Sequence, residues 1–330
     1  MRLATFNLES LDMPPKASVP LEQRIELLRP QLDRLAADIL CLQEVNGQRP
    51  KGGRERRLLA LERLLETTPY ADYARACTTG PEGKGVADVH NLVILSRFPI
   101  LETQQVRHDL VQAPSYRRAT AKPQDAAAVD VGWDRPILQA TVELPGGRPL
   151  HVFNVHLRAP LAATVPGQKS APFVWKSTTG WAEGYFLAAI KRTGQALELR
   201  LAVDRILDAN AKALIAVCGD LNAEDHDTPL RIVIAAEEDT GSGALAARAM
   251  VPLERSLAKE RRFTVLHHGR PQMLDHILVS RQLLGHFQAL KIHNETLEDE
   301  LVGYAKVDRP PESFHAPVVA EFAVGEKGSG

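Results

Sequence analysis

The stretch Ala213-Leu214-Ile215-Ala216-Val217-Cys218-Gly219-Asp220-Leu221-Asn222 ends an apolar run with a carboxylate and an amide that have one residue between them. Residues 213–217 have the length and composition of a buried strand. Because α/β folds bind ligands beyond the carboxyl ends of their strands, Asp220 and Asn222 are candidates for a functional site. Asp and Asn also favour turns, and taken alone the motif is more typical of a turn.

The same arrangement, an apolar run beside a cluster of polar side chains, recurs along the chain. Further runs lead to or follow Asn7, Gln43-Glu44, Asn154-Val155-His156, Asp275-His276 and Ser313-Phe314-His315. Repetition of this kind favours a shared site over separate turns. Because such a site draws on almost the whole length, we expect a single domain over residues 1–324.

The composition is that of an ordinary soluble globular protein. The chain has 330 residues, of which 44% are hydrophobic and 25% are charged. Lys and Arg number 40 against 41 Asp and Glu, so no basic excess indicates a long nucleic-acid partner. Cys41, Cys77 and Cys218 are odd in number and widely spaced, which predicts buried free thiols rather than disulfides or a thiolate zinc site.

The N-terminal residues read as a strand and show neither the apolar region nor the cleavage site of a signal peptide. No apolar run reaches the length needed to cross a bilayer. We therefore expect a cytoplasmic protein without a transmembrane segment, and the sequence indicates no obligate protein partner. The Gly- and Lys-rich residues 325–330 are expected to form a flexible tail.

Helical and strand-like spacing alternate along the chain. Apolar residues at three- and four-residue steps predict helices over 21–35, 54–66 and 183–207. Residues 91–96 are predicted to form a strand, and 137–144 with 150–155 a β-hairpin. Residues 107–130 show no sustained period and are expected to form a long loop.

Residues 158–181 are a predicted insertion between a strand and a helix. The segment shows no clear period and contains several prolines together with Phe173, Trp175 and Trp181. Long insertions are often binding loops or lids, and we predict a lid here. An ordered surface flap that packs its own aromatic side chains fits the sequence equally well.

The chain resembles the endonuclease/exonuclease/phosphatase superfamily in the order of its motifs. These are Asn7, Glu44, Asn154-x-His156, Gly219-Asp220-Leu221-Asn222, Leu274-Asp275-His276-Ile277 and Ser313-Phe314-His315-Ala316-Pro317-Val318, supported by the strand and turn over 91–100. The resemblance covers residues 2–322 and does not single out a member. It implies an α/β (α+β) fold: a four-layer sandwich of two facing mixed β-sheets flanked by helices, with the site at one end.

The resemblance also implies a cofactor, Mg²⁺ or Mn²⁺, held by Glu44 with Asn7 beside it. Hydrolysis of a phosphoester needs in-line attack by water while negative charge on the phosphoryl oxygens is neutralised. A hard dication held by a carboxylate and an amide oxygen suits this task. For Glu44 the alternative is a surface carboxylate at a strand end, and for Asn7 a turn or backbone cap.

The remaining motif residues are implied to form the reaction centre. Asp220 and Asn222 would orient the attacking water and hold a phosphate oxygen. His156 would donate a hydrogen bond to a non-bridging oxygen. His315, hydrogen-bonded to Asp275, would stabilise developing charge or transfer a proton.

The chain departs from the superfamily pattern at Phe314, where an Asp usually precedes the final His. Loss of this carboxylate puts a second metal site in question. Asp308 lies upstream and is a possible substitute. For the group that some family nucleases place against the phosphate, Tyr116 and Arg135 are candidates, and each fits a structural role equally well.

The sequence therefore predicts a divalent-metal-dependent hydrolase of phosphoesters, with a phosphodiesterase or nuclease acting on nucleic acid or nucleotides in first place. A phospholipid, sphingomyelin or inositol-phosphate hydrolase is the first alternative, because the aromatic insertion around Trp175 fits an apolar substrate portion. A non-catalytic binding protein on the same fold is the second alternative, motivated by Phe314.

Overall fold

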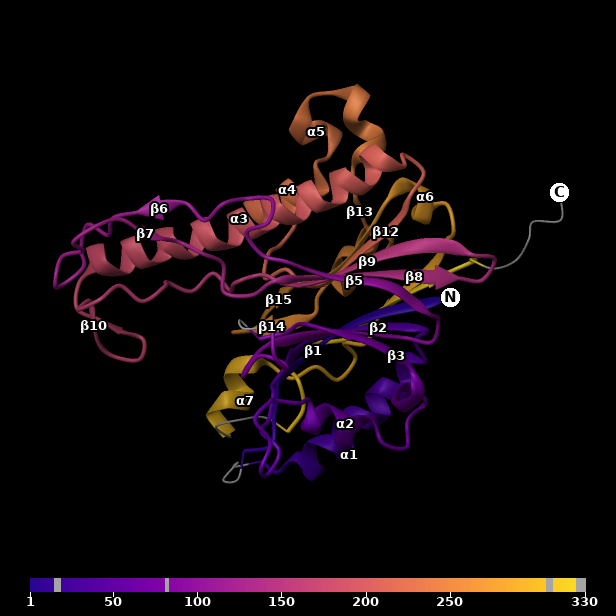
Figure 1. The fold of residues 1–330 in the computed structure, drawn as a ribbon, viewed down its shortest axis with the longest axis horizontal. Helices are drawn as coiled ribbons and strands as arrows, with labels where there is room; N and C mark the ends of the chain where they lie inside the picture. Colours follow the sequence, from indigo (N-terminus) through magenta and orange to yellow (C-terminus); the bar gives the residue numbers. More distant parts are fainter. Residues whose placement is uncertain (15–18, 81–82, 307–310, 325–330) are drawn as a thin grey trace.

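The computed structural model of the protein describes residues 1–14, 19–80, 83–306 and 311–324. Within these ranges the chain forms two six-stranded mixed sheets that face each other, with helices on the two outer faces (Figure 1). The predicted four-layer sandwich is confirmed. The predicted tail at 325–330 and Asp308 lie outside the described residues.

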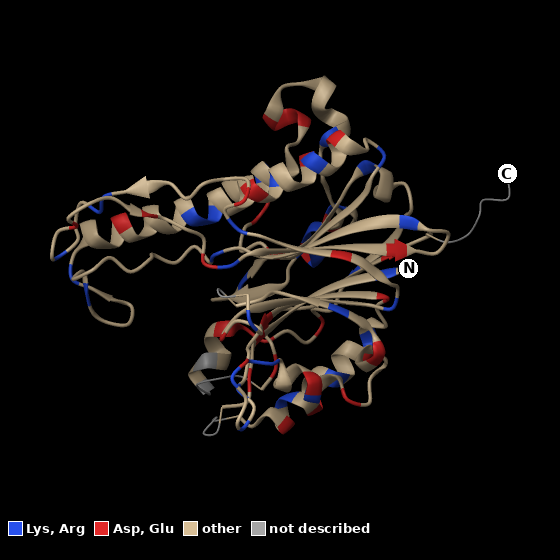
Figure 2. Ribbon diagram, viewed as in Figure 1, with Lys and Arg blue, Asp and Glu red and all other residues tan. Residues whose placement is uncertain are grey.

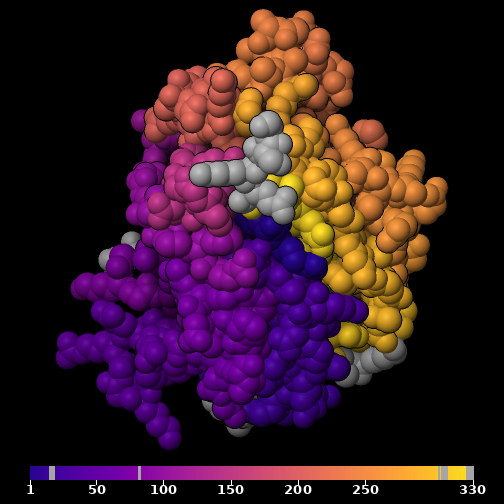
Figure 3. All heavy atoms as spheres, turned by 90° about the vertical axis from the view of Figure 1, so that its right-hand side faces the viewer, coloured from indigo at the N-terminus to yellow at the C-terminus, as the bar shows by residue number. Residues whose placement is uncertain are grey.

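The first sheet carries the N-terminal strand at its centre. Its spatial order is β17 (Phe287–Ile292), β18 (Val318–Phe322), β1 (Arg2–Leu11), β2 (Ile39–Val45), β4 (Asn91–Ser96) and β3 (Ala74–Cys77). Strands β1 and β2 are parallel, and β18 runs antiparallel to β1. Figure 3 shows the yellow C-terminal part of the chain beside the indigo N-terminus. Helices α1 (Leu21–Leu35) and α2 (Leu59–Leu65) cover the outer face and bury apolar side chains such as Leu28, Leu32 and Leu61 against it.

The second sheet carries the predicted hairpin and the strand of the opening motif. Its spatial order is β13 (Val251–Pro252), β16 (Asp275–Val279), β12 (Leu214–Asp220), β9 (Arg148–His156), β8 (Ile137–Leu144) and β5 (Ile100–Val106). Strand β12 runs parallel to β9 and antiparallel to β16. Helices α3 (Thr178–Ala209) and α4 (Thr228–Ile234) cover its outer face.

Shorter elements complete the described chain. They are α5 (Glu237–Thr240), α6 (Arg281–Leu284), α7 (Glu300–Lys306) and three two-stranded ribbons, β6 (Ser115–Tyr116) with β7 (Val129–Asp130), β10 (Lys169–Ala171) with β11 (Val174–Trp175), and β14 (Val265–His267) with β15 (Arg270–Gln272). None of the helices in the described ranges combines the length and the apolarity needed to span a membrane.

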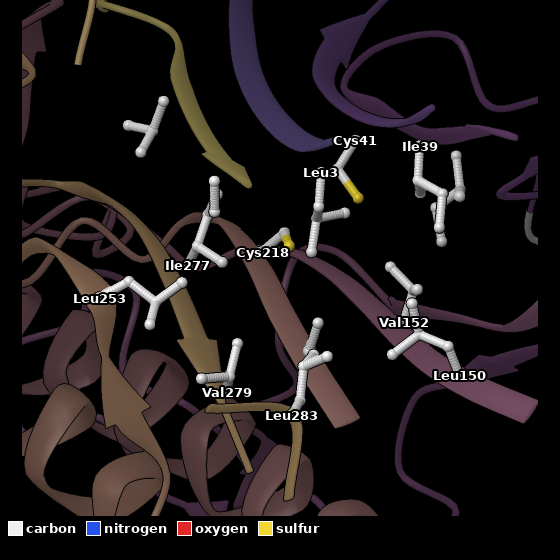
Figure 4. Close-up of a cluster of buried hydrophobic side chains, with 14 of the residues drawn as sticks. Leu3, Ile39, Cys41, Leu150, Val152, Cys218, Leu253, Ile277, Val279 and Leu283 are labelled. Carbon is white, nitrogen blue, oxygen red and sulfur yellow. The ribbon is translucent and has the colours of Figure 1, made fainter. Parts of the chain in front are cut away.

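The main core fills the space between the two sheets. Figure 4 shows side chains from both sheets meeting there, including Leu3, Ile39, Val152 and Ile277. Each is fully buried, and removing such a side chain from water stabilises a fold by about 1.5–3 kcal/mol. Cys41 and Cys218 lie in the same cluster as free thiols, while Cys77 is half-buried and also free.

The N-terminal half of α3 extends beyond the sheets and forms an arm with residues 115–131 and 163–177 (Figure 1). The arm has a small core of its own that includes Val131, Val165 and Leu187. Buried Glu183 on α3 binds the neighbouring segment: its carboxylate accepts hydrogen bonds from the Tyr116 hydroxyl at 3.0 Å, from the Thr120 N–H at 2.8 Å, and from Ala119 N and the Thr120 hydroxyl. The arm is therefore an ordered part of the fold.

Three predicted boundaries differ from the structure, each for a local reason. The expected long loop at 107–130 contains β6 and β7, which the arm orders. The insertion at 158–181 contains β10, β11 and the start of α3, because Ser177 caps the helix by accepting a hydrogen bond from Gly180 N at 3.0 Å. Helix α2 begins at Leu59 instead of 54, because Arg57 pairs with Gln48 in a β-bridge.

Lys and Arg positions are interspersed with Asp and Glu positions along the sheets, the outer helices and the arm (Figure 2). This distribution agrees with the near-zero net charge of the chain. A long duplex is held mainly through contacts with its phosphates, and the balanced charge of the chain gives no basic excess for such contacts.

Candidate active site

The motif residues converge where the central strands of both sheets end. Asn7 lies on β1, Glu44 on β2, His156 on β9 and Asp220 on β12. Because β1 runs parallel to β2 and β9 runs parallel to β12, their carboxyl ends meet at one edge of the sandwich. Strand β16 arrives from the opposite direction, so that its first residue, Asp275, pairs with Asp220, which in turn pairs with His156.

Asp220 lies at the centre of the cluster and is 1% exposed. Its carboxylate accepts hydrogen bonds from Asn222 N at 2.8 Å, Asn222 Nδ2 at 3.1 Å and Asn7 Nδ2 at 3.0 Å. Burial and repulsion from Asp275 raise the pKa of Asp220 to about 7, although His315 acts in the opposite direction. A carboxylate with such a pKa is suited to accept a proton near neutral pH.

Asn222 holds this geometry through its backbone conformation. It adopts a left-handed φ of 49°, which Asn tolerates better than most residues. Its Nδ2 also donates to the Leu157 carbonyl at 3.1 Å, and its own carbonyl accepts from Arg192 of α3. Contacts with Leu157, which follows β9, and with Arg192 of α3 therefore hold Asn222 in place, and Asn222 in turn positions the Asp220 carboxylate.

Glu44 lies beside this group, across Asn7. Its carboxylate accepts from Ser10 N at 3.0 Å, from the Ser10 hydroxyl at 3.1 Å and from Asn7 Nδ2 at 3.2 Å. Burial alone would raise the pKa of Glu44, but the His90 and His315 rings and the Asn7 hydrogen bond hold it below its ordinary value. Glu44 is therefore ionised at neutral pH.

Asn7 is fully buried and bridges the two carboxylates through one nitrogen. Its Nδ2 donates to both Glu44 and Asp220, while its Oδ1 accepts from Glu9 N at 2.9 Å. If the Asn7 amide were flipped, its oxygen would face the Glu44 and Asp220 carboxylates, and its NH₂ group would face the Glu9 N–H. Both contacts would be unfavourable, so these partners fix the orientation of the amide. In this arrangement Asn7 orients the Glu44 and Asp220 carboxylates through its nitrogen, while its side-chain oxygen is directed at Glu9 N.

Asp275 and His315 form a hydrogen-bonded pair. The His315 Nδ1 lies 2.7 Å from Asp275 Oδ2. Burial alone would lower the pKa of His315, but Asp275 raises it well above the ordinary value, so the ring is an imidazolium at neutral pH. The Ser313 hydroxyl ties this segment to β1 by donating to the Asn7 carbonyl at 2.7 Å.

The ring of Phe314 packs away from these groups. It lies against Gly303 of α7, where an added Cβ would come within 1.9 Å of the ring. The Phe314 backbone N–H donates to the Glu9 carboxylate at 2.7 Å. The Asp275–His315 pair is therefore formed without a carboxylate at position 314.

His156 is 2% exposed and faces both carboxylates. Its Nε2 lies 3.4 Å from Asp220 Oδ2 and 3.7 Å from Glu44 Oε1. Its Nδ1 is buried and makes no hydrogen bond to any described residue. Burial and the field of Arg135 hold the pKa of His156 well below its ordinary value, so the ring is neutral.

Sequence reasoning missed His90, which follows an irregular loop and precedes β4. The residue adopts a left-handed φ of 57° and its N–H donates to Asn46 Oδ1 at 3.0 Å. The ring is turned toward the site, with Nδ1 3.6 Å from Glu44 Oε2 and with its centroid 6.0 Å from that of His156. Nothing in Asp88-Val89-His90 distinguishes this histidine from a surface residue.

Arg135 and Tyr116, the two candidates for the group placed against the phosphate, lie in different parts of the structure. Arg135 precedes β8, donates to the Leu157 carbonyl at 3.3 Å, and has a buried Nε without a partner among the described residues. Burial lowers the pKa of Arg135 despite the favourable fields of Glu44 and Asp220, which places its charge beside the centre. Tyr116 lies on the arm, bound to Glu183.

The fold and the site together define an α/β sandwich of the phosphoesterase class. The chain belongs to the endonuclease/exonuclease/phosphatase family, whose sequence profile matches residues 4–294. Members of this family are hydrolytic phosphoesterases. The family predicted from the order of the motifs is thus confirmed.

Solved structures share the fold at low identity. An AP endonuclease from Archaeoglobus fulgidus is 16% identical, with 98% of this chain and 100% of that chain covered and a TM-score of 0.52. A mannosyl-6-phosphatase from Bacteroides thetaiotaomicron is 15% identical, with 98% and 99% covered and a TM-score of 0.58. The 3′ phosphatase NExo from Neisseria, bound to a product DNA hairpin, is 18% identical, with 98% and 99% covered and a TM-score of 0.52. A comparison with curated proteins gives no match.

Proposed function

We propose that this protein hydrolyses a phosphodiester with the help of a divalent cation, as a nuclease or nucleotide phosphodiesterase. The observation that carries the proposal is the meeting of Asp220 with the Asp275–His315 pair at one buried strand edge. One side of the centre holds a carboxylate suited to accept a proton, and the other holds an imidazolium. The AP endonuclease and the DNA-bound phosphatase among the similar structures support a nucleic-acid or nucleotide substrate.

The residues present fit a divalent cation, Mg²⁺ or Mn²⁺. Glu44, Asp220 and Asp275 place three carboxylates close together, and burial together with repulsion from Asp275 raises the pKa of Asp220. Glu44 would hold the cation, with Asn7 orienting its carboxylate. A bound dication neutralises charge on the phosphoryl oxygens as water attacks.

The protein's own groups supply the proton transfers. Asp220, held by Asn7 and Asn222, accepts a proton from the attacking water. His315, kept charged by Asp275, stabilises the charge that develops on the leaving oxygen or protonates it. His156 completes the centre as a neutral ring that faces the phosphoryl group.

The test is hydrolysis of bis-p-nitrophenyl phosphate with Mg²⁺ or Mn²⁺ by the wild type, Glu44→Ala and His315→Ala. A matched control is His226→Ala, which changes an exposed histidine outside the cluster. We expect turnover by the wild type and the control and a large loss in the other two. Absence of turnover by the wild type on any phosphoester would favour the non-catalytic alternative, and unchanged activity in both variants would place the centre elsewhere.

The arm gives specific support to the lipid alternative. Phe173 at the turn of the β10–β11 ribbon is 80% exposed, and Val174, Trp181 and Tyr185 are 52%, 43% and 45% exposed. Exposed aromatic and aliphatic groups gathered on one projecting arm fit contact with an apolar portion of a substrate. Activation by micelles with little salt dependence would favour a phospholipid, sphingomyelin or inositol-phosphate substrate. A steep loss of affinity with rising salt would favour nucleic acid.

A further inference from the structure

The histidines around Glu44 differ from other histidine–carboxylate pairs of the described chain in their spacing. At Glu44 the nitrogen-to-oxygen distances are 3.6 Å to His90 and 3.7 Å to His156, beyond hydrogen-bond length. His156 Nε2 also lies 3.4 Å from Asp220 Oδ2, whereas three other pairs form direct hydrogen bonds: 2.7 Å for Asp275–His315, 2.5 Å for Glu254–His276 and 2.7 Å for Glu300–His267. His90 and His156 thus face the Glu44 carboxylate without forming a hydrogen bond to it.

The spacing at Glu44 is that of ligands around a metal ion. Two ligands about 2.0–2.1 Å from a tetrahedral metal lie about 3.4 Å apart. One donor atom each from Glu44, His90 and His156 lies within 4.8 Å of the other two. His90 Nδ1 lies 3.6 Å from Glu44 Oε2 and His156 Nε2 lies 3.7 Å from Oε1, so each ring faces a different carboxylate oxygen across a gap of ligand-to-ligand size.

The nitrogens that face Glu44 are available as ligands. Nδ1 of His90 is buried and makes no hydrogen bond to a described residue. Nδ1 of His156, on the far side of its ring, is likewise without a described partner, so no hydrogen bond fixes the tautomer and Nε2 can present a lone pair. The left-handed backbone of His90, which is uncommon for a residue with a Cβ, directs its ring to this point.

The oxygens beside Glu44 are already engaged. The side-chain oxygen of Asn7, Oδ1, accepts from Glu9 N, and its Nδ2 donates to Glu44. Asp220 Oδ2, 3.4 Å from His156 Nε2, accepts from Asn7 Nδ2 and Asn222 Nδ2. A Mg²⁺ ion prefers oxygen ligands, whereas imidazole nitrogens suit Zn²⁺ and its neighbours in the first transition row. Two imidazoles and one carboxylate therefore favour a different cation from the one that the motifs imply.

We propose that Glu44, His90 and His156 bind a later first-row transition-metal dication, of the Zn²⁺ and Co²⁺ class, in preference to Mg²⁺ and Mn²⁺. The inference rests on the proposed function in placing the cation at the reaction centre. It also refines the role of His156, from a donor to a phosphoryl oxygen to a ligand of the cation. The two roles require the ring proton on different nitrogens, Nε2 for the donor and Nδ1 for the ligand.

The test is a titration of the metal-free full-length protein with Co²⁺, followed by its visible d–d absorption, and then competition with Zn²⁺, Mn²⁺ and Mg²⁺. The main variant is His90→Gly, because glycine adopts the left-handed backbone freely and removes the ring without straining the fold. His90→Asn and His156→Asn are the second variants, and the exposed His226→Ala is the control. Thermal melting of each variant checks folding.

We expect one Co²⁺ per wild-type chain, displaced by Zn²⁺ but not by an equal concentration of Mg²⁺. His90→Gly should weaken Co²⁺ binding by more than the roughly 10- to 100-fold that loss of an outer-shell partner costs, while His226→Ala binds as the wild type does. Wild-type Co²⁺ affinity in folded His90→Gly and His156→Asn would overturn the proposal, and so would displacement by equimolar Mg²⁺.

Phosphoester hydrolysis, measured in parallel, separates this proposal from the function. Histidine-dependent Co²⁺ binding without turnover of any phosphoester would retain the metal site and reject the hydrolase. Turnover with Mg²⁺ that depends on Glu44 and His315, together with Co²⁺ binding that ignores His90, would retain the hydrolase and reject this site.

Discussion

Glu254→Gln is expected to destabilise the fold in a pH-dependent way, because it removes the partner of a buried histidine. His276 follows Asp275 on β16 and faces away from the reaction centre. Its Nδ1 lies 2.5 Å from Glu254 Oε1 and its Nε2 lies 2.8 Å from the Ala223 carbonyl. A carbonyl and an ionised carboxylate can only accept, so both ring nitrogens carry protons and His276 is an imidazolium.

The magnitude follows from the pKa of this ring. Burial alone would lower the pKa of His276, but Glu254 outweighs it and the Ala223 carbonyl adds to the effect, which raises the pKa from 6.5 to about 9. At about 1.4 kcal/mol for each pH unit, this difference contributes about 3 kcal/mol to folding. Because the folded pKa lies above the unfolded one, the contribution is complete below about pH 6.5 and is lost as the pH rises through about 9.

The assay is urea unfolding of the wild type and Glu254→Gln at about pH 6 and about pH 10, with Glu238→Gln as the control. Glu238 is an exposed carboxylate on α5, so its variant should match the wild type. Comparing the wild type with the variant cancels the other titrating groups. We expect a loss of about 3 kcal/mol near pH 6 and a much smaller loss near pH 10. An equal loss at both pH values, or none at pH 6, would refute the charged pair.

Three further predictions concern the centre, the strand that carries it and the arm. His315→Ala should lower kcat/KM for bis-p-nitrophenyl phosphate by about 10² to 10⁴ at a temperature where the variant is still folded, and its Tm should fall because buried Asp275 loses its charged partner. A smaller loss of kcat/KM would deny His315 a role in proton transfer. Gly219→Ala should lower the free energy of unfolding in urea by at least about 3 kcal/mol, because the φ of Gly219 is 138° and a Cβ would lie 1.9 Å from the Val155 carbonyl oxygen. The comparison is Gly146→Ala at an open turn, which should lower it by about 1 kcal/mol. Glu183→Ala should open residues 115–130 to limited proteolysis, detected by mass spectrometry of the fragments, with the sandwich uncut; an unchanged cleavage pattern would show that Glu183 does not hold the arm.

The central strands were predictable because sequence and geometry agree there. Residues 213–217 form an uninterrupted apolar run and residues 150–155 a mostly apolar one, so both were recognised as strands, and all of these residues except His151 are buried in the structure. Each run ends in a polar residue, and parallel pairing of β9 with β12 brings Asp220 opposite His156. Local periodicity thus placed these two groups at strand ends, while the family resemblance was needed to bring them to one edge.

The arm could not be predicted in the same way, because its order comes from contacts between distant residues. Residues 107–130 lack an apolar period, yet two carboxylates of α3 organise the segment. Glu183 binds residues 116–120, and fully buried Glu198 accepts hydrogen bonds from Leu110 N at 3.0 Å and from Trp133 Nε1 at 2.6 Å. Glutamates in a helix read as solvent-facing, so no local signal marks them as buried anchors.

His90 escaped prediction for a related reason. Its position depends on a left-handed backbone that the residue type does not favour, and the turn is held by the side chain of Asn46, 44 residues earlier in the chain. Arg135 was recognised as a candidate, but its nearness to Glu44 and Asp220 is a property of the folded chain. Motif order identified the residues of the family pattern, and it did not reveal His90, whose place at the site depends on the folded chain.

Phe314 and His90 together suggest how this centre differs from the pattern that its motifs imply. At position 314 the chain places an aromatic ring against Gly303, so this position offers no side-chain oxygen beside His315. Across Asn7, His90 brings a nitrogen to within 3.6 Å of Glu44. The His315 side thus keeps the Asp220 and Asp275 carboxylates without a third at position 314, and the Glu44 side gains a softer nitrogen ligand. Because imidazole favours the later first-row cations, this exchange would shift the preference of the centre from Mg²⁺ to one of these cations. The cation would then bind on the Glu44 side of the centre. If so, restoring the carboxylate with Phe314→Asp should not recover Mg²⁺ preference unless His90 is also replaced.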